Sequence, residues 1–269
     1  MTAPMDPVEF RARGFCVARS FFDREEMAAL LAAIEGSRPA EAPRDALTDG
    51  SMIFDSTVFR RSEAVRAAIA KQKIIDLMGP ITGGDVWVRW DQAVSKHPGA
   101  GDFQWHQDNA YNGLPVEHYQ LWIALTPSRN ANGTLWLAPG SHKRGLLPHV
   151  PVAGRRQLAV RAPIGETICV DADVGDVVLF SSLMLHRTGP NHTTSTRVAY
   201  VVEYMPFRDY DAWVEGPFFL AFEGGRSRPR FVDRQPGAGT LRNELLYVVP
   251  RAKRLLESVT KRRRPGREA

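Results

Sequence analysis

The sequence is poor in the features that mark secreted, membrane-embedded and disordered proteins. It has only two cysteines, Cys16 and Cys169, and their wide separation and lack of metal-ligand spacing argue against a disulfide framework. No run of about 18 apolar residues occurs, so no membrane-spanning helix is predicted. The opening segment, MTAPMDPVEF, has an early acidic residue and no apolar stretch, so we expect no secretory signal. These absences lead us to expect a cytoplasmic protein.

A large excess of charge of one sign is also missing. Lys and Arg number 35 against 30 Asp and Glu, the net charge is +5, and the 43% hydrophobic and 24% charged contents are typical of a globular protein. Basic residues gather near the end, in TKRRRPGREA: Lys261, Arg262, Arg263, Arg264 and Arg267. Such a run can bind nucleic acid or an anionic membrane, but a solvated terminus is the simpler interpretation because no nucleic-acid-binding motif accompanies it. We expect no nucleic-acid partner, and the strand edges carry no pattern that indicates an oligomeric state.

The first part of the chain has helical patterning. Residues 23–35 predict a helix, because Asp23 and Glu26 have the spacing of a capping box and apolar residues follow with helical periodicity at Met27, Leu30, Leu31 and Ile34. A second amphipathic helix is predicted over 62–78. Between them, 36–52 is rich in proline, glycine and small polar residues, which indicates a loop.

From residue 85 the composition changes to short segments rich in β-branched and aromatic residues, such as DVWVRWDQAV, HYQLWIAL and RVAYVVEYM. Turn signals such as NANG and PGSH separate them. This pattern predicts a sandwich or barrel of the jelly-roll kind, mainly β with flanking helices. We expect one domain over 1–269, with a helical part over about 1–84, a β core over about 85–206 and a C-terminal extension over about 207–269.

Two polar residues in QWHQDNAYNG stand where a metal site could begin. On a strand, Gln104, His106 and Asp108 share one face, so His-x-Asp presents an imidazole beside a carboxylate. That pair is two thirds of the facial triad that holds non-haem Fe(II). A polar pair on a strand edge gives the same pattern, so a third ligand is required.

His186 is the candidate third ligand, because the apolar segment GDVVLFSSLML leads directly into it and a buried imidazole needs a partner. Arg197 begins the next strand on the same side as Ala199 and Val201, and a buried arginine needs an anion that its planar fork can hold. The other histidines are expected to be solvated or locally bonded in loops: His97, His118, His142, His149 and His192.

Together these segments resemble the phytanoyl-CoA dioxygenase-like family of Fe(II)/2-oxoglutarate-dependent oxygenases. The resemblance covers most of 8–206 and is carried by FRARGFCVARSFF, WHQDNAY, NGTLWLAPGSHKRG, GDVVLFSSLMLHRTGPN and RVAYVVEY. It implies a double-stranded β-helix of cupin-like form. It also implies a hydroxylase that uses Fe(II), 2-oxoglutarate and O2, releases succinate and CO2, and acts on an unactivated C–H bond of a small organic or lipid-like substrate.

The resemblance also implies residue roles. His106, Asp108 and His186 would be the iron ligands, and Arg197 would bind the C5 carboxylate of 2-oxoglutarate. Further contacts to the cosubstrate would come from Thr188, Trp122 and Gln104. Related halogenases have a small residue in place of this carboxylate, so the presence of Asp108 indicates hydroxylation.

Contacts to the prime substrate are expected near the metal, from Gln92, Lys96, Asn109 and Tyr111, with a surface lysine as the alternative for Lys96. Residues 40–60 either form a lid through Met52, Phe54 and Phe59 or place these side chains in the core, and 213–231 has the same two interpretations. Two other functions are compatible with part of the pattern. One is a zinc-dependent hydrolase or isomerase, against which Arg197 argues, and the other is a non-catalytic jelly-roll binding module, which has no need of all four polar residues.

Overall fold

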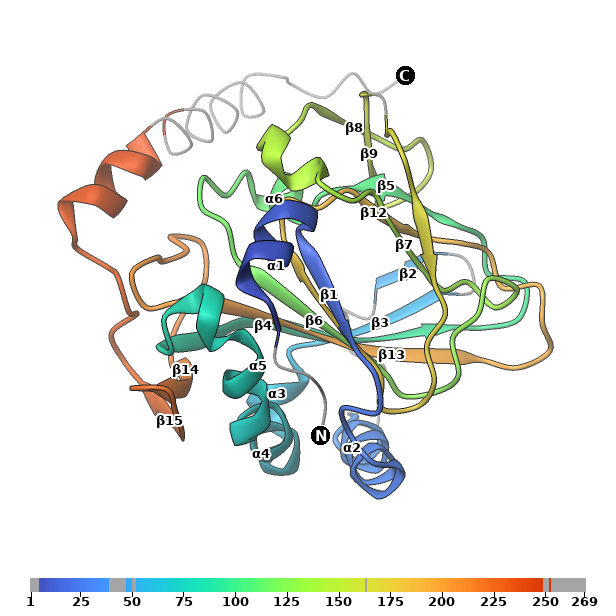
Figure 1. Cartoon of the computed structure of the whole chain (residues 1–269), viewed down its shortest axis with the longest axis horizontal. Coiled ribbons are helices and arrows are strands. Elements are labelled where there is room, and N and C mark those ends of the chain that lie inside the picture. Colours follow the sequence, from blue (N-terminus) through green and yellow to red (C-terminus); the bar gives the residue numbers. More distant parts are fainter. Residues whose placement is uncertain (1–4, 39–46, 50–51, 163, 249–251, 253–269) are drawn as a thin grey trace, which may run out of the picture.

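The computed structural model describes residues 5–38, 47–49, 52–162, 164–248 and 252. The basic residues of the tail and part of the predicted loop, 39–46, lie outside these ranges. Two antiparallel β-sheets form the body of the molecule, with helices packed on the larger one (Figure 1). The predicted jelly-roll fold, mainly β with flanking helices, is confirmed.

The larger sheet has the strand order β1 (Phe15–Ala18), β11 (Val177–Ser181), β6 (Tyr119–Ala124), β13 (Arg197–Pro206), β4 (Val86–Lys96), β14 (Phe218–Glu223) and β15 (Arg226–Val232). Strand β3 (Met52–Ser56) also pairs with β4, and β2 (Leu47–Asp49) pairs with β3. The expectation of a loop over 36–52 is therefore wrong for 47–49 and for Met52. Pairing with the neighbouring strand overrides the weak strand preference of that stretch.

The smaller sheet has the order β10 (Ile168–Val170), β7 (Leu135–Leu137), β12 (His186–Thr188) and β5 (Phe103–His106), and β8 (His149–Pro151) pairs with β9 (Leu158–Val160). Its side chains pack against the inner face of the larger sheet in one apolar cluster, which includes Trp122, Leu137, Phe180 and Ala199. Both sheets thus bury one face against the other, as in a sandwich.

Short helices accompany the sheets: α1 (Pro7–Arg13), α2 (Arg24–Gly36), α3 (Val58–Arg61), α4 (Glu63–Ile69), α5 (Gln72–Thr82), α6 (Asn109–Asn112) and the 3-10 turn η1 (Ser141–Arg144). Helix α2 has the predicted capping box. The single helix predicted over 62–78 is two helices, because α4 ends at Ile69 and α5 begins at Gln72. In the described ranges, none of these helices combines the length and apolar character that crossing a bilayer requires.

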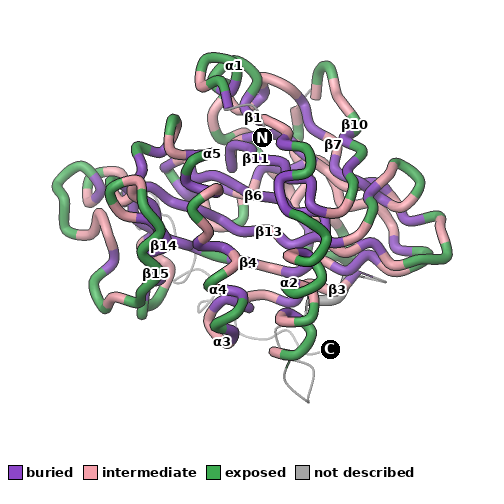
Figure 2. Tube along the Cα trace, turned by 60° about the horizontal axis from the view of Figure 1, so that its bottom comes forward, coloured by how far each residue is buried: buried purple, intermediate pink, exposed green. Residues whose placement is uncertain are grey.

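Alternation along the central strands separates the inner and outer faces of the larger sheet. In β6, Leu121 and Ile123 join the cluster formed with α2, α4 and α5, whereas Trp122 joins the cluster between the sheets. Every residue of β6 and most residues of β13 and β4 are accordingly buried (Figure 2). Phe59 is 1% exposed and lies in the outer cluster, so for this residue the core interpretation holds and the lid interpretation is wrong.

Glu26 links α2 to α5 and provides a test of the helical layer. Burial opposes its ionisation, but hydrogen bonds from Lys71, Lys73 and the backbone N–H of Asp23 lower its pKa from 4.5 to about 2. Glu26→Gln keeps the capping-box geometry and removes the charge, so the free energy of unfolding at pH 7 is expected to fall by about 1–2 kcal/mol.

Because the folded-state pKa is the lower one, this contribution is present above about pH 4.5 and is lost as the pH falls towards 2. Urea denaturation of both proteins over that range measures the difference. The matched control is Glu25→Gln, an exposed residue of the same helical turn, which is expected to cost less than about 0.5 kcal/mol. Equal losses for the two variants would contradict the assignment.

Candidate metal and cosubstrate site

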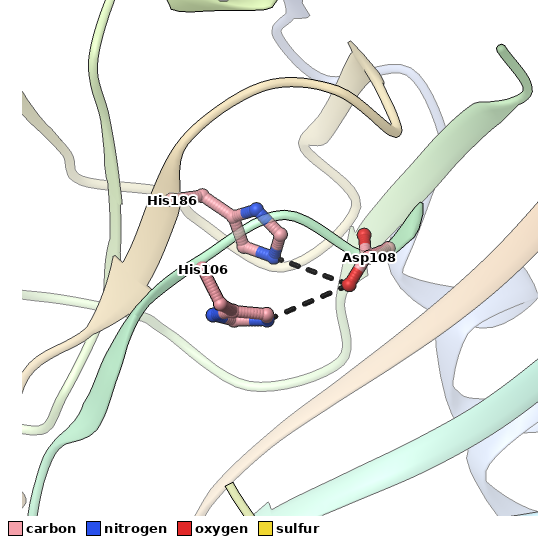
Figure 3. A group of neighbouring side chains, drawn as sticks. All are labelled: His106, Asp108 and His186. Atoms are coloured by element: carbon pink, nitrogen blue, oxygen red, sulfur yellow. Dashed lines mark ion pairs between the residues drawn. The ribbon is translucent and has the colours of Figure 1, made fainter. Parts of the chain in front are cut away.

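Three side chains, two from paired strand ends and one from the turn after β5, converge on one point (Figure 3). His106 ends β5 and His186 begins β12, where the two are paired residues. Their Nε2 atoms lie 3.5 Å and 3.6 Å from Oδ1 of Asp108, and the three candidate ligand atoms lie within 4.8 Å of one another. Two imidazoles and one carboxylate at such spacing are the donor set of a facial triad.

Hydrogen bonds fix which nitrogen of each imidazole faces the centre. Nδ1 of His106 lies 2.7 Å from the carbonyl oxygen of Gln104, and Nδ1 of His186 lies 3.0 Å from that of Met184. A carbonyl oxygen only accepts, so each Nδ1 carries the proton and each Nε2 keeps its lone pair for a metal. The two rings therefore have the tautomer that ligation requires.

The charge states also suit a metal. Burial and the nearby His106 lower the pKa of His186 to about 4, so this imidazole is neutral at physiological pH. Burial alone would raise the pKa of Asp108, but the two neighbouring imidazoles outweigh it and hold the pKa below its usual value. A carboxylate and a neutral imidazole are deprotonated ligands of the kind that a divalent cation binds.

The backbone between the first two candidate ligands differs from the expected strand. β5 ends at His106, and Asp108 is in the αR region at the start of α6, so Asp108 reaches the centre from a helical turn. Gln104 shares a strand with His106, but its Nε2 donates to Asp102 at 2.7 Å and the side chain does not line the cavity. The expected contact of the Gln104 side chain with 2-oxoglutarate is therefore not supported.

A cavity of about 440 Å³ contains the three candidate ligands, and Arg197, Thr188 and Trp122 also line it. Arg197 is 1% exposed and donates one hydrogen bond, from Nη2 to the carbonyl oxygen of Gly133 at 3.0 Å. Its Nε and Nη1 have no hydrogen-bond partner among the described residues. Burial lowers the pKa of Arg197 to about 10, which leaves the guanidinium charged at neutral pH. A buried cation with two unused donors suits a carboxylate ligand.

Lys96 is neither a surface lysine nor a residue of the cavity wall, the two positions expected for it. It is 0% exposed, so the interpretation as a surface lysine is wrong. It is absent from the cavity wall, and its Nζ donates to Oγ1 of Thr188 at 3.0 Å and to the carbonyl oxygen of Gly189. Lys96 thus orients Thr188 through the hydrogen bond to its Oγ1 and does not itself line the cavity.

Two of the remaining substrate candidates line the cavity and one does not. Gln92 and Tyr111 belong to the wall, as do Met52 and Phe54 of β3. Asn109 is buried away from it, and its Nδ2 donates to the carbonyl oxygens of Leu114 and Val116. A structural role in the turn after β5 therefore replaces the expected substrate contact of Asn109. Trp213 and Val214 also line the cavity, so the segment 213–231 contributes to its closure.

A cluster of charged and polar side chains at the same cavity was not predicted from the sequence. Arg89 donates to Glu203 and, at 2.6 Å, to Asp211, and His118 lies 3.4 Å from Glu203. His118 is 0% exposed, so it is not solvated. It lies in the loop before β6, with its Nε2 3.2 Å from Nε2 of Gln120, so of the two alternatives the locally bonded loop histidine is the one that holds. Strand alternation places Gln120 with Trp122 and Glu203 with Arg197 on the inner face, and that signal was available in the sequence.

An antiparallel jelly roll with a His-Asp-His centre and a buried arginine in one cavity defines the class of non-haem, metal-dependent oxygenases. Comparison with known sequences agrees, because the sequence model of the family "Phytanoyl-CoA dioxygenase (PhyH)" matches residues 10–199. The chain belongs to this family. Membership of this family disfavours both the zinc enzyme and the binding module.

Individual relatives carry related descriptions. Dioxygenase lolE1 of Epichloe uncinata is 33% identical over 142 residues, which are 52% of this chain and 54% of that protein. The probable alpha-ketoglutarate-dependent hypophosphite dioxygenase of Stutzerimonas stutzeri is 27% identical over 76% of this chain and 78% of its own length. The chain therefore spans about half of the first relative and about three quarters of the second. The solved structure of the non-heme monooxygenase ThoJ shares the fold, with a TM-score of 0.69 at 23% identity over 94% of this chain and 98% of that chain.

Proposed function

We propose that His106, Asp108 and His186 hold Fe(II), that Arg197 binds the far carboxylate of 2-oxoglutarate, and that the protein hydroxylates a C–H bond of a small organic substrate. The observation that carries this proposal is that two guanidinium nitrogens of Arg197, in the cavity that contains the triad, have no partner in the described part of the chain. A facial triad leaves coordination positions open for a chelating keto acid and O2. Bound together, Fe(II) and 2-oxoglutarate supply the oxidising power, with succinate and CO2 as products.

The residues around the centre then have separate tasks. Arg197 fixes one end of the cosubstrate through two charge-assisted hydrogen bonds. Thr188 accepts a hydrogen bond from Lys96, so its own proton is directed elsewhere and can be donated to the same carboxylate. Trp122, Leu135 and Phe180 form apolar wall around the centre and exclude water, which strengthens these polar contacts.

The size and lining of the cavity support an organic prime substrate. About 440 Å³ is within the range of small-molecule sites. The name of the Stutzerimonas relative refers to hypophosphite, an ion far smaller than this cavity. Aromatic side chains, among them Phe54, Trp90 and Tyr111, also line the wall, so we infer a larger substrate with an apolar body.

We also propose that the protein acts in the cytoplasm and forms one domain. Cys16 and Cys169 are both free thiols, which supports the reducing cytoplasm as the site of action. One domain over 1–269 is supported by the strands β14 and β15, which extend the larger sheet beyond residue 206.

The proposed reaction is tested first without the prime substrate. Under anaerobic conditions, Fe(II) and 2-oxoglutarate are expected to give a weak visible charge-transfer band, and admission of O2 is expected to give slow formation of succinate. Zn(II) in place of Fe(II) serves as the control and is expected to give neither. If the protein shows no band and no succinate, the proposed site is wrong, and hydrolysis supported by Zn(II) without O2 would favour the zinc enzyme instead.

A further inference from the structure

The inner face of the larger sheet arranges the cavity wall in rows across three strands. Trp122, Val201 and Gln92 are register partners across β6, β13 and β4, and Gln120, Glu203 and Trp90 form the next row. Glu203 is six residues from Arg197 on β13, a separation of roughly 20 Å along the strand. Because Arg197 marks the cosubstrate end in the proposed function, the row with Glu203 lies at the opposite end of the cavity.

Two hydrogen-bond acceptors lie side by side in this row. Gln120 is 0% exposed and lines the cavity, and its Oε1 has no hydrogen-bond partner among the described residues. Its Nε2 lies 3.2 Å from Nε2 of His118. Both ion pairs of the directly opposite Glu203 use Oε2, which leaves Oε1 of this cavity-lining carboxylate for a ligand. A buried acceptor without a donor is unfavourable unless a ligand supplies one.

A β-bulge provides the charges next to this row. The register between β13 and β4 shifts at Glu203, so Arg89 and Trp90 both line the cavity although they are adjacent in sequence. The Arg89 guanidinium binds the carboxylates of both Glu203 and Asp211. Burial disfavours the charge on Glu203, but Arg89 and His118 outweigh it and keep the pKa of Glu203 below its usual value.

The net charge at each end of the cavity indicates which ligand group can bind next to Gln120 and Glu203. Fe(II) and Arg197 together carry as much positive charge as Asp108 and 2-oxoglutarate carry negative charge, so the loaded centre is neutral. Glu203 and Asp211 share the single guanidinium of Arg89, so with the imidazole of His118 neutral the far end of the cavity carries one excess negative charge. The remaining lining cation, Arg156, is exposed at the mouth, where solvent screens it.

We propose that Gln120, Glu203 and Arg89 form the recognition subsite for the prime substrate, and that this subsite takes a protonated amine or a similar cationic N–H donor attached to a small apolar body. The two acceptor oxygens bind the N–H groups, and the ring of Trp90, which lies in the same row, stabilises the positive charge. This inference rests on the proposed function for the direction of the substrate in the cavity.

Three probes with one ring and different polar groups test the subsite: cyclohexylamine, cyclohexanol and cyclohexanecarboxylate. Their binding to the protein loaded anaerobically with Fe(II) and 2-oxoglutarate is measured by calorimetry. The amine is expected to bind at least about 10-fold more tightly than the carboxylate, because a hydrogen bond to a charged group contributes at least that factor. Binding of the carboxylate as tightly as the amine would overturn the proposal.

Two variants assign the preference to residues. Glu203→Gln removes the charge and is expected to reduce the amine preference to within about 3-fold. Gln120→Leu removes the second acceptor without disturbing Arg89, and is expected to weaken amine binding by about 5-fold or more, so it remains informative if Glu203→Gln fails to fold. An unchanged preference in Gln120→Leu and in any folded Glu203→Gln would also overturn the proposal. The charge-transfer band is recorded for every sample, so a lost preference with the band intact is distinguished from failure of the proposed iron site.

Discussion

Asp108→Ala is expected to remove metal binding and turnover together. The substitution deletes the only anionic member of the candidate ligand set and leaves two neutral imidazoles, which hold Fe(II) poorly. Changing a residue that merely orients a ligand typically costs 10–100-fold in metal affinity, so loss of a ligand is expected to cost at least about 100-fold. Anaerobic titration with Co(II), followed by its visible absorption, measures the affinity, and succinate formation measures turnover.

The fold is expected to tolerate this change. Asp108 stands at the N-cap of α6 but its side chain makes no capping hydrogen bond, and its ion pairs are to His106 and His186. The thermal midpoint of the metal-free variant is therefore expected to stay within about 4 °C of that of the parent. Asp102→Asn is the matched control, because Asp102 pairs with Arg155 outside the cavity and should leave metal affinity unchanged. Full Co(II) affinity in Asp108→Ala would show that the metal lies elsewhere.

Much of the candidate metal and cosubstrate site could be predicted from the sequence, because its residues lie on or next to strands with a clear alternation of apolar residues. The apolar run before His186 indicates a buried strand end, and alternation along β13 indicates the side on which Arg197 lies, before any coordinates are known. The same rule applied to β6 and β13 would also have placed Gln120 and Glu203 on the inner face. That step requires knowing which strands are neighbours, and the pairing of β6 with β13 joins residues about 80 apart in the chain.

Other features depend on tertiary contacts that periodicity does not describe. The bulge that brings Arg89 to the cavity is a register shift between two strands, and no residue type in VWVRWDQAV marks it. Lys96 looks like a surface residue because lysine is seldom buried, yet backbone carbonyls and Thr188 at the end of β12 satisfy its ammonium group. Asn109 follows the metal-ligand motif directly, but the turn after β5 uses its amide.

Arg197→Met is expected to weaken 2-oxoglutarate by about 100-fold, because two hydrogen bonds between charged groups are lost. Metal affinity is expected to change by less than about 3-fold, since Arg197 is not among the candidate ligands. The cosubstrate constant is measured by anaerobic titration of the charge-transfer band with 2-oxoglutarate, and the metal constant is measured with Co(II). Equal loss of both affinities would mean that Arg197 acts on the structure of the centre as a whole.

Stability separates a ligand-binding role from a structural one. Without an anion, Arg197 is a buried cation with two donors that no described residue satisfies, and Lys96 is its register partner on β4. Replacing it by the apolar Met is therefore expected to raise the free energy of unfolding of the ligand-free protein by about 1 kcal/mol. The matched control is Arg187→Met on β12, where the guanidinium packs over the rings of Trp105 and Trp136. The Arg187→Met change is expected to lower stability and to leave 2-oxoglutarate affinity within about 2-fold. A loss of stability in Arg197→Met as well would contradict the binding role of Arg197.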